Sequence, residues 1–132
     1  MIFQDYNLVP RASVLTNVLA GKLGFTTSWA ALFNHFPQEH VDEAFDKLER
    51  LGISEKADKQ AAGLSGGQQQ RVGIARALMQ DPDWVLADEP VSSLDPATSR
   101  TILDILRQIN REKKVTVLCN LHVPELAMEY GQ

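Results

Sequence analysis

The segment Leu64-Ser65-Gly66-Gly67-Gln68 has the composition of an anion-binding turn. Two glycines that follow a serine at the start of a predicted helix present backbone N–H groups, and the helix dipole favours a negative charge at that end. Glycine also lets the backbone approach a ligand closely. The pattern therefore predicts a phosphate-binding helix start; the alternative is an ordinary serine-capped helix with a glycine-rich turn.

An acidic pair, Asp88-Glu89, follows the apolar run Trp84–Ala87, and His122 follows a second apolar run, Val115–Cys119. Because the carboxyl ends of parallel strands face the ligand crevice, we expect these three side chains to share one crevice. One carboxylate could hold Mg²⁺, the next could position or deprotonate a water, and the imidazole could bind a phosphate oxygen. Taken singly, the alternatives are two solvated acids and a helix-capping histidine.

The elements that position these residues alternate between strand and helix after Gly63. Helices are predicted over Gly66–Gln80, from Pro96 with Asp95 as its N-cap, and from Pro124 to about Tyr130. The two apolar runs between them read as buried strands. This alternation predicts an α/β fold built on a parallel sheet.

The chain before Gly63 has a different, helical pattern. Helices are predicted from Ser13 to a close near Gly21, over residues 28–36, and from Pro37 to Leu51. Met1-Ile2-Phe3 reads as the end of a buried strand, with Gln4 just beyond it. Because nothing upstream forms the rest of that strand, we expect Met1 to be an internal methionine of a longer parent.

Composition and charge exclude several classes of protein. The 132 residues carry 13 Lys+Arg and 17 Asp+Glu, a net charge of −4 that argues against a nucleic-acid-binding surface. The single cysteine, Cys119, excludes an internal disulfide framework. No apolar run approaches the roughly 18 residues of a membrane span, and no signal peptide is recognisable. The expectation is a soluble, cytoplasmic chain.

Read together, these motifs resemble those of the nucleotide-binding subunits of ABC transporters. The stretches that carry the resemblance are Leu64–Val72, Asp88-Glu89-Pro90, Ser92-Ser93-Leu94-Asp95 and Leu121-His122, and they stand in the family's order. The resemblance covers essentially the whole chain. It implies a partial P-loop NTPase fold, α/β in class, whose parallel sheet core carries an inserted all-helical subdomain.

The resemblance also implies a domain organisation. Residues 1–132 would form a single incomplete ABC ATPase domain, with the end of a core strand and the Q-loop in 1–5, the helical subdomain in 6–62, and the signature motif with the C-terminal part of the ATPase core in 63–132. The sequence contains no Gly-x-x-x-x-Gly-Lys-Ser/Thr segment, the Walker A loop that the family carries upstream of the Q-loop. We therefore expect a subunit truncated at both ends.

One set of residues is implied to bind nucleotide. Ser65, Gly66, Gly67 and Gln68 resemble the signature motif, which closes on the ATP held by a partner subunit. Asp95 resembles the D-loop aspartate, which links the two sites across the dimer. The implied cofactors are ATP and Mg²⁺.

A second set is implied to carry the hydrolysis of ATP. Asp88 resembles the Walker B aspartate that binds Mg²⁺ through water, and Glu89 the glutamate that polarises the attacking water. His122 resembles the switch histidine that contacts the γ-phosphate. Gln4 resembles the Q-loop glutamine, which senses Mg²⁺ and the nucleophile.

A narrower resemblance points to the phosphonate importer ATPases. It is carried by the stretches Phe3–Arg11, Ser13–Gly21, Leu106–Glu112 and Asn120–His122. It implies an ATPase subunit that couples ATP hydrolysis to phosphonate uptake, forms a homodimer in the intact parent, and docks through its helical subdomain on a transmembrane permease. Such a subunit lies on the cytoplasmic, inner face of the membrane and has no nucleic-acid partner.

The missing Walker A loop bears on activity. Each charge-assisted hydrogen bond to a triphosphate contributes about 1.5–3 kcal/mol. The loss of three such bonds weakens binding by about three to six orders of magnitude. We therefore expect these 132 residues alone not to hydrolyse ATP. Two alternatives stay open: a non-catalytic interaction or regulatory module without Walker A, and an ABC ATPase that serves another solute or export.

Overall fold

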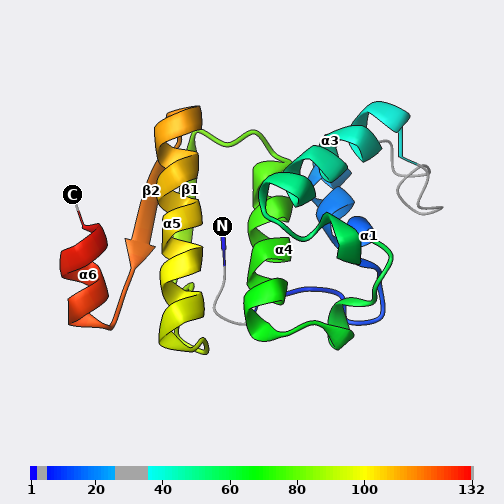
Figure 1. Ribbon diagram of the computed structural model, residues 1–132. Helices are drawn as coiled ribbons and strands as arrows, with labels where there is room; N and C mark the ends of the chain where they lie inside the picture. The colour runs from blue at the N-terminus through cyan, green and yellow to red at the C-terminus, as the bar shows by residue number, and fades with distance from the viewer. Residues whose placement is uncertain (3–5, 26–35, 132) are drawn as a thin grey trace. The chain divides into compact units, whose positions relative to one another are not determined.

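The computed structural model describes residues 1–2, 6–25 and 36–131, and the chain divides into two compact units (Figure 1). The sheet unit consists of Met1–Asn7 and Pro82–Gln132, and the helical unit of Leu8–Asp81. No helix among the described residues is long and apolar enough to cross a membrane.

In the described residues of the helical unit, three α-helices pack on one another. They are α1 (Val14–Leu19), α3 (Gln38–Arg50) and α4 (Gly66–Leu78), and three short 3₁₀ helices accompany them, η1 (Ala20–Phe25), η2 (Ser54–Lys56) and η3 (Ala61–Gly63). Helix α1 contacts both α3 and α4, and α3 also contacts α4. The side chains of Val14, Val18, Leu48 and Val72 are fully buried in this unit. The predicted helices from Ser13, Pro37 and Gly66 are thereby confirmed.

The first α-helix ends at Leu19 with Ala20 as its C-cap, which confirms the predicted end near Gly21, and the chain continues as the 3₁₀ helix η1. The main chain of Gly21 lies so close to α4 that a Cβ there would collide with the carbonyl of Arg76. This glycine therefore serves a close helix contact and not a helix end. The helix predicted over 28–36 falls almost wholly outside the described residues.

The part of the sheet unit that the structure describes holds two parallel strands, β1 (Trp84–Asp88) and β2 (Thr116–Asn120). Helix α5 (Pro96–Lys113) forms the crossover between them and packs on β2, and α6 (Pro124–Tyr130) packs on α5. Ile2 forms a parallel bridge with Ala87 on the other side of β1. The predicted parallel sheet, with the end of a third strand at the start of the chain, is confirmed for the described residues.

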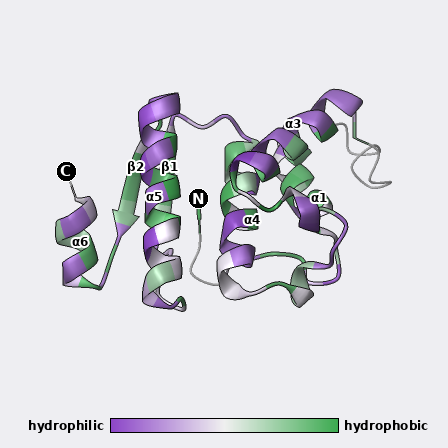
Figure 2. Ribbon diagram, viewed as in Figure 1, coloured by the Kyte–Doolittle hydropathy of each residue, from purple (hydrophilic) through white to green (hydrophobic). Residues whose placement is uncertain are grey.

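The prediction that the two apolar runs form buried strands is wrong for one face of the sheet. Val85 and Ala87 are buried, but Trp84 is 68% exposed and Leu86 49% exposed, and Leu118 on β2 is 59% exposed. Figure 2 colours β2 as largely hydrophobic. Burial of a parallel sheet on two faces needs cover on each of them, and the described elements leave one face open to solvent.

The division into units follows packing. Helix α4 contacts α1, α3 and η1 and so belongs to the helical unit, which extends to Asp81. The predicted boundary between the helical subdomain (6–62) and the rest of the ATPase core (63–132) follows from the family resemblance, and it stays a prediction.

Candidate functional site

The acidic pair stands where the two strands end. The parallel register pairs Asp88 with Asn120, the last residues of β1 and β2. The side-chain amide Nδ2 of Asn120 donates a hydrogen bond of 3.0 Å to Oδ1 of Asp88. Both side chains are exposed. The bond fixes one carboxylate oxygen of Asp88 and leaves the other open toward solvent.

Glu89 follows in an unusual backbone conformation. Its φ of 46° lies in the left-handed region, which costs energy for a residue with a side chain. Its N–H donates to the carbonyl of Asn120 (3.2 Å), and its own carbonyl accepts from the N–H (3.3 Å) and the hydroxyl (3.2 Å) of Ser92. Three hydrogen bonds therefore hold the strained turn that directs this carboxylate.

His122 and Glu89 are in direct contact. Nε2 of His122 lies 2.7 Å from Oε1 of Glu89, and their side chains are 69% and 25% exposed. Their meeting confirms the expectation that residues just beyond the two strands share one end of the sheet. Asn120, His122 and Ser92 together fix the positions of both acids.

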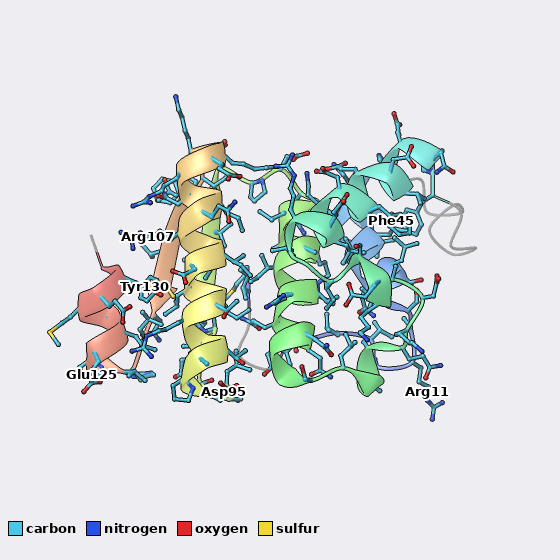
Figure 3. All side chains as sticks on the ribbon, viewed as in Figure 1. Arg11, Phe45, Asp95, Arg107, Glu125 and Tyr130 are labelled. Carbon is cyan, nitrogen blue, oxygen red and sulfur yellow. The ribbon has the colours of Figure 1, made fainter. Side chains whose placement is uncertain are left out.

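Asp95 lies at the start of α5 (Figure 3). Its Oδ1 accepts hydrogen bonds from the backbone N–H groups of Ala97 (3.1 Å) and Thr98 (3.0 Å). Hydrogen bonds from the side chain and backbone of Thr98, and then from Ala97, lower the pKa of Asp95 below its ordinary value. The predicted N-cap is confirmed, and the carboxylate stays ionised at neutral pH.

The glycine-rich turn stands at the start of α4 in the helical unit. The hydroxyl of Ser65 accepts from the N–H of Gln68 (3.4 Å), and Oε1 of Gln68 accepts from the N–H of Ser65 (3.0 Å), which makes a capping box. The serine-capped helix is therefore present. The N–H groups of Gly66 and Gly67 are the first-turn donors that the helix itself cannot satisfy.

The described residues offer a carboxylate for a magnesium–nucleotide complex and no closed metal cage. No group of three or more His, Cys, Asp or Glu side chains that could hold an ion occurs in the described part of the chain. Mg²⁺ keeps several waters and is usually bound by one or two carboxylates together with substrate phosphates. An exposed Asp88 with one open oxygen fits that mode of binding.

The contact between Asn120 and Asp88 was not predicted from the sequence. Aligning the two apolar runs as parallel strands places Asn120 opposite Asp88, and this alignment is the signal from which the contact could be predicted. Gln4 lies outside the described residues, so its predicted role is not placed in the structure.

The sequence of this chain is similar to a family model and to curated proteins of related function. Residues 1–92 match the family model described as ABC transporter. The chain is 53% identical over 131 residues to the phosphonates import ATP-binding protein PhnC of Staphylococcus haemolyticus. It is 54% identical, again over 131 residues, to phosphonates import ATP-binding protein PhnC 1 of Oceanobacillus iheyensis. In both cases the match covers 99% of this chain and 51% of the relative, so the chain spans about half the length of these curated relatives.

The solved structures that resemble this chain include two ATP-binding cassettes. A nucleotide-free cassette from an ABC transporter matches with a TM-score of 0.80 and 29% identity, over 92% of this chain and 50% of that one. The dimeric bacterial ABC transporter cassette MJ0796 matches with a TM-score of 0.73 and 32% identity, over 96% of this chain and 53% of that one.

Proposed function

This chain belongs to the ABC transporter family, and on that premise we propose that it forms part of the ATP-binding subunit of an importer for phosphonates. The observation that carries the proposal is the contact of Glu89 with His122 beside Asp88 at one end of a parallel sheet. More than half of the aligned residues are identical to those of two phosphonates import ATP-binding proteins, and this identity supports phosphonates as the transported substrate.

In the proposed reaction each residue at the strand ends has a separate task. Asp88 would hold Mg²⁺, and the bound ion would neutralise the charge of the nucleotide phosphates. The carboxylate of Glu89 would orient and polarise the attacking water, and the His122 imidazole keeps that carboxylate in place. Asn120 holds Asp88 from the neighbouring strand.

The signature turn would act on a nucleotide held by another subunit. The N–H groups of Gly66 and Gly67 at the start of a 13-residue helix suit a phosphate, and the capping box fixes their direction. We propose ATP and Mg²⁺ as cofactors, a second ATP-binding subunit as one partner, and a permease that contacts the helical unit as another. In that arrangement the subunit would lie on the cytoplasmic face of the membrane.

A second candidate rests on the signature turn itself, whose capping box holds the N–H groups of Gly66 and Gly67 at the start of α4. Without the phosphate cradle and lysine, the chain could still offer its signature turn to a complete subunit. It would then act as a non-catalytic interaction module.

The two candidates are separated by adding the missing loop. The chain is assayed for Mg²⁺-dependent ATP hydrolysis alone and after fusion to those parts of the Staphylococcus haemolyticus relative that it does not match. We expect no turnover from the chain alone. From the fusion we expect turnover that Glu89→Gln lowers by about 10²- to 10⁴-fold, whereas the matched change of an exposed acid, Glu55→Gln, leaves it unchanged. A folded but inactive fusion would favour the interaction module.

The substrate is tested in cells that carry the fusion with the relative's permease and binding protein. Growth on a phosphonate as the sole source of phosphorus is expected for the fusion and not for its Glu89→Gln variant. ATP hydrolysis without such growth would refute the phosphonate assignment and leave the ATPase assignment standing.

A further inference from the structure

Asn17 is a buried polar residue that holds a surface turn of the helical unit. Its side chain is 1% exposed. Its Oδ1 accepts from the N–H of Val9 (2.7 Å), and its Nδ2 lies within hydrogen-bond distance of the carbonyls of Val9 (3.1 Å), Ser13 (3.0 Å) and Ala12 (3.5 Å). One side chain thus fixes both ends of the segment Val9–Ala12.

The segment it holds is a tight turn with exposed side chains. The N–H of Ala12 donates to the carbonyl of Val9 (3.1 Å), and Pro10 stands at the second position, where its fixed φ favours a turn. Val9, Pro10 and Arg11 are exposed, and Figure 3 shows the Arg11 side chain extending away from the helices of its unit. The turn is therefore open to contact from outside.

The same turn anchors the residues that come directly before the signature motif. The carbonyl of Ala12 accepts from the N–H of Ala61 (3.1 Å), and the carbonyl of Pro10 accepts from the N–H of Ala62 (3.0 Å). Both acceptors belong to the turn that Asn17 fixes, and the Ala12 carbonyl is shared between Asn17 and Ala61. The helix η3 is thereby fastened to the Val9–Ala12 turn.

From η3 the connection continues into the first turn of α4. The side chain of Gln69 donates to the carbonyl of Ala61 (3.0 Å), and the N–H of Gln69 donates to the carbonyl of Ser65 (2.8 Å). The N–H of Leu64 donates to that same Ala61 carbonyl (3.2 Å). Ala61 therefore connects the Val9–Ala12 turn, through its N–H, with Leu64 and Gln69 beside the signature serine, through its carbonyl.

We propose that Asn17 is a positioning residue for the signature turn, and that it makes the exposed turn Val9–Ala12, η3 and Ser65 move as one body. A partner that displaces the exposed turn then displaces the signature turn with it. The identity of that partner as a permease, and of the ligand as a nucleotide, rests on the proposed function. The mechanical connection does not depend on either.

The connection is tested by amide hydrogen exchange on the 132-residue chain. Asn17→Asp keeps the shape and the Oδ1 acceptor but replaces the donors by a carboxyl oxygen that faces the carbonyls of Val9, Ala12 and Ser13. We expect exchange at Ala61 and Ala62 to become at least about tenfold faster, because each lost hydrogen bond contributes up to about a factor of ten and a buried carboxyl group beside carbonyl oxygens is disfavoured further. The matched control is Asn110→Asp, which removes one side-chain bond to the Val115 carbonyl in the sheet unit and should leave these amides unchanged.

The pattern of exchange decides between positioning and general support. Faster exchange at Val9 and Ala12 alone would overturn the proposal, and so would a uniform increase throughout the helical unit with a matching loss of thermal stability.

A second measurement uses the unchanged chain, in case Asn17→Asp does not fold. Under native-state exchange in low denaturant, the amides of Ala12, Ala61 and Leu64 should open with the same free energy and the same denaturant dependence. Different values would overturn the proposal as well. Neither measurement involves ATP, so a failure here is separate from a failure of the proposed function.

Discussion

Asp95 stabilises the start of α5 through hydrogen bonds that depend on its charge. Hydrogen bonds from Thr98 and Ala97 lower its pKa below the ordinary 3.8, so its stabilisation is complete above the pKa of the unfolded chain and is lost as the pH falls through the lower folded value. We expect Asp95→Ala to lower the Tm at pH 7, and the deficit to shrink as the pH is reduced below about 3.8. Asp95→Asn keeps a capping oxygen but not the charge, and its Tm at pH 7 should lie between those of the unchanged chain and of Asp95→Ala. Circular-dichroism melts between pH 7 and pH 3 check this, and a deficit independent of pH would contradict it.

The residues of the site were predictable from sequence where a local rule applies. Asp95 and Ser65 cap helices because their short side chains accept from the next turn, and this pattern is visible in the sequence alone. The meeting of Glu89 and His122 followed from strand order. The role of Asn120 requires the register of two strands separated by an 18-residue helix, and the left-handed φ of Glu89 requires the turn that encloses it.

Helix α3 is anchored by a charge cluster centred on Glu43. Its carboxylate lies 3.1 Å from Nζ of Lys22 and 3.3 Å from Nζ of Lys47, whose side chains are only 12% and 6% exposed. Glu43→Gln removes one carboxylate from Lys47 and one from Lys22, which keeps Asp81 at 3.2 Å, and we expect the free energy of unfolding to fall by about 1–3 kcal/mol. The matched control on the same helix is Asp46→Asn, which breaks an exposed pair with Arg50 and should cost less than about 0.5 kcal/mol. Urea denaturation of both variants checks this, and equal costs would refute it.

Local chemistry predicted the helix bounds, but it did not reveal the reason for each of them. The starts at Pro96 and Pro124 were predicted to the residue, because proline suits only the first turn and has no N–H to pair. The α-helix after Ser13 ends at Leu19, close to the predicted end near Gly21, but Gly21 serves a contact with α4, some 55 residues further along the chain. A local pattern can therefore mark a helix bound, while contacts with distant segments decide which residue must stand there.

At the scale of the whole molecule, the sheet unit carries an apolar face that the described elements of this unit leave uncovered. Leu86 and Leu118 are partners in the register of β1 and β2, and Trp84 lies in the same row, with 49%, 59% and 68% exposure respectively. An exposed apolar row beside an open strand edge favours association between copies. We therefore expect the 132-residue chain to self-associate with rising concentration.

Charge placed on that row should suppress the association. Leu118→Lys puts a cation on an edge strand, a change that natural sheets use against edge-to-edge pairing, and it should shift the chain toward monomer in sedimentation velocity. The control is Met128→Lys on α6, which replaces a single side chain that is 79% exposed and lies outside the row. We expect that variant to associate like the unchanged chain. If both variants are equally monomeric, net charge and not the sheet face governs association; if the unchanged chain is monomeric at every concentration, the uncovered face does not drive it.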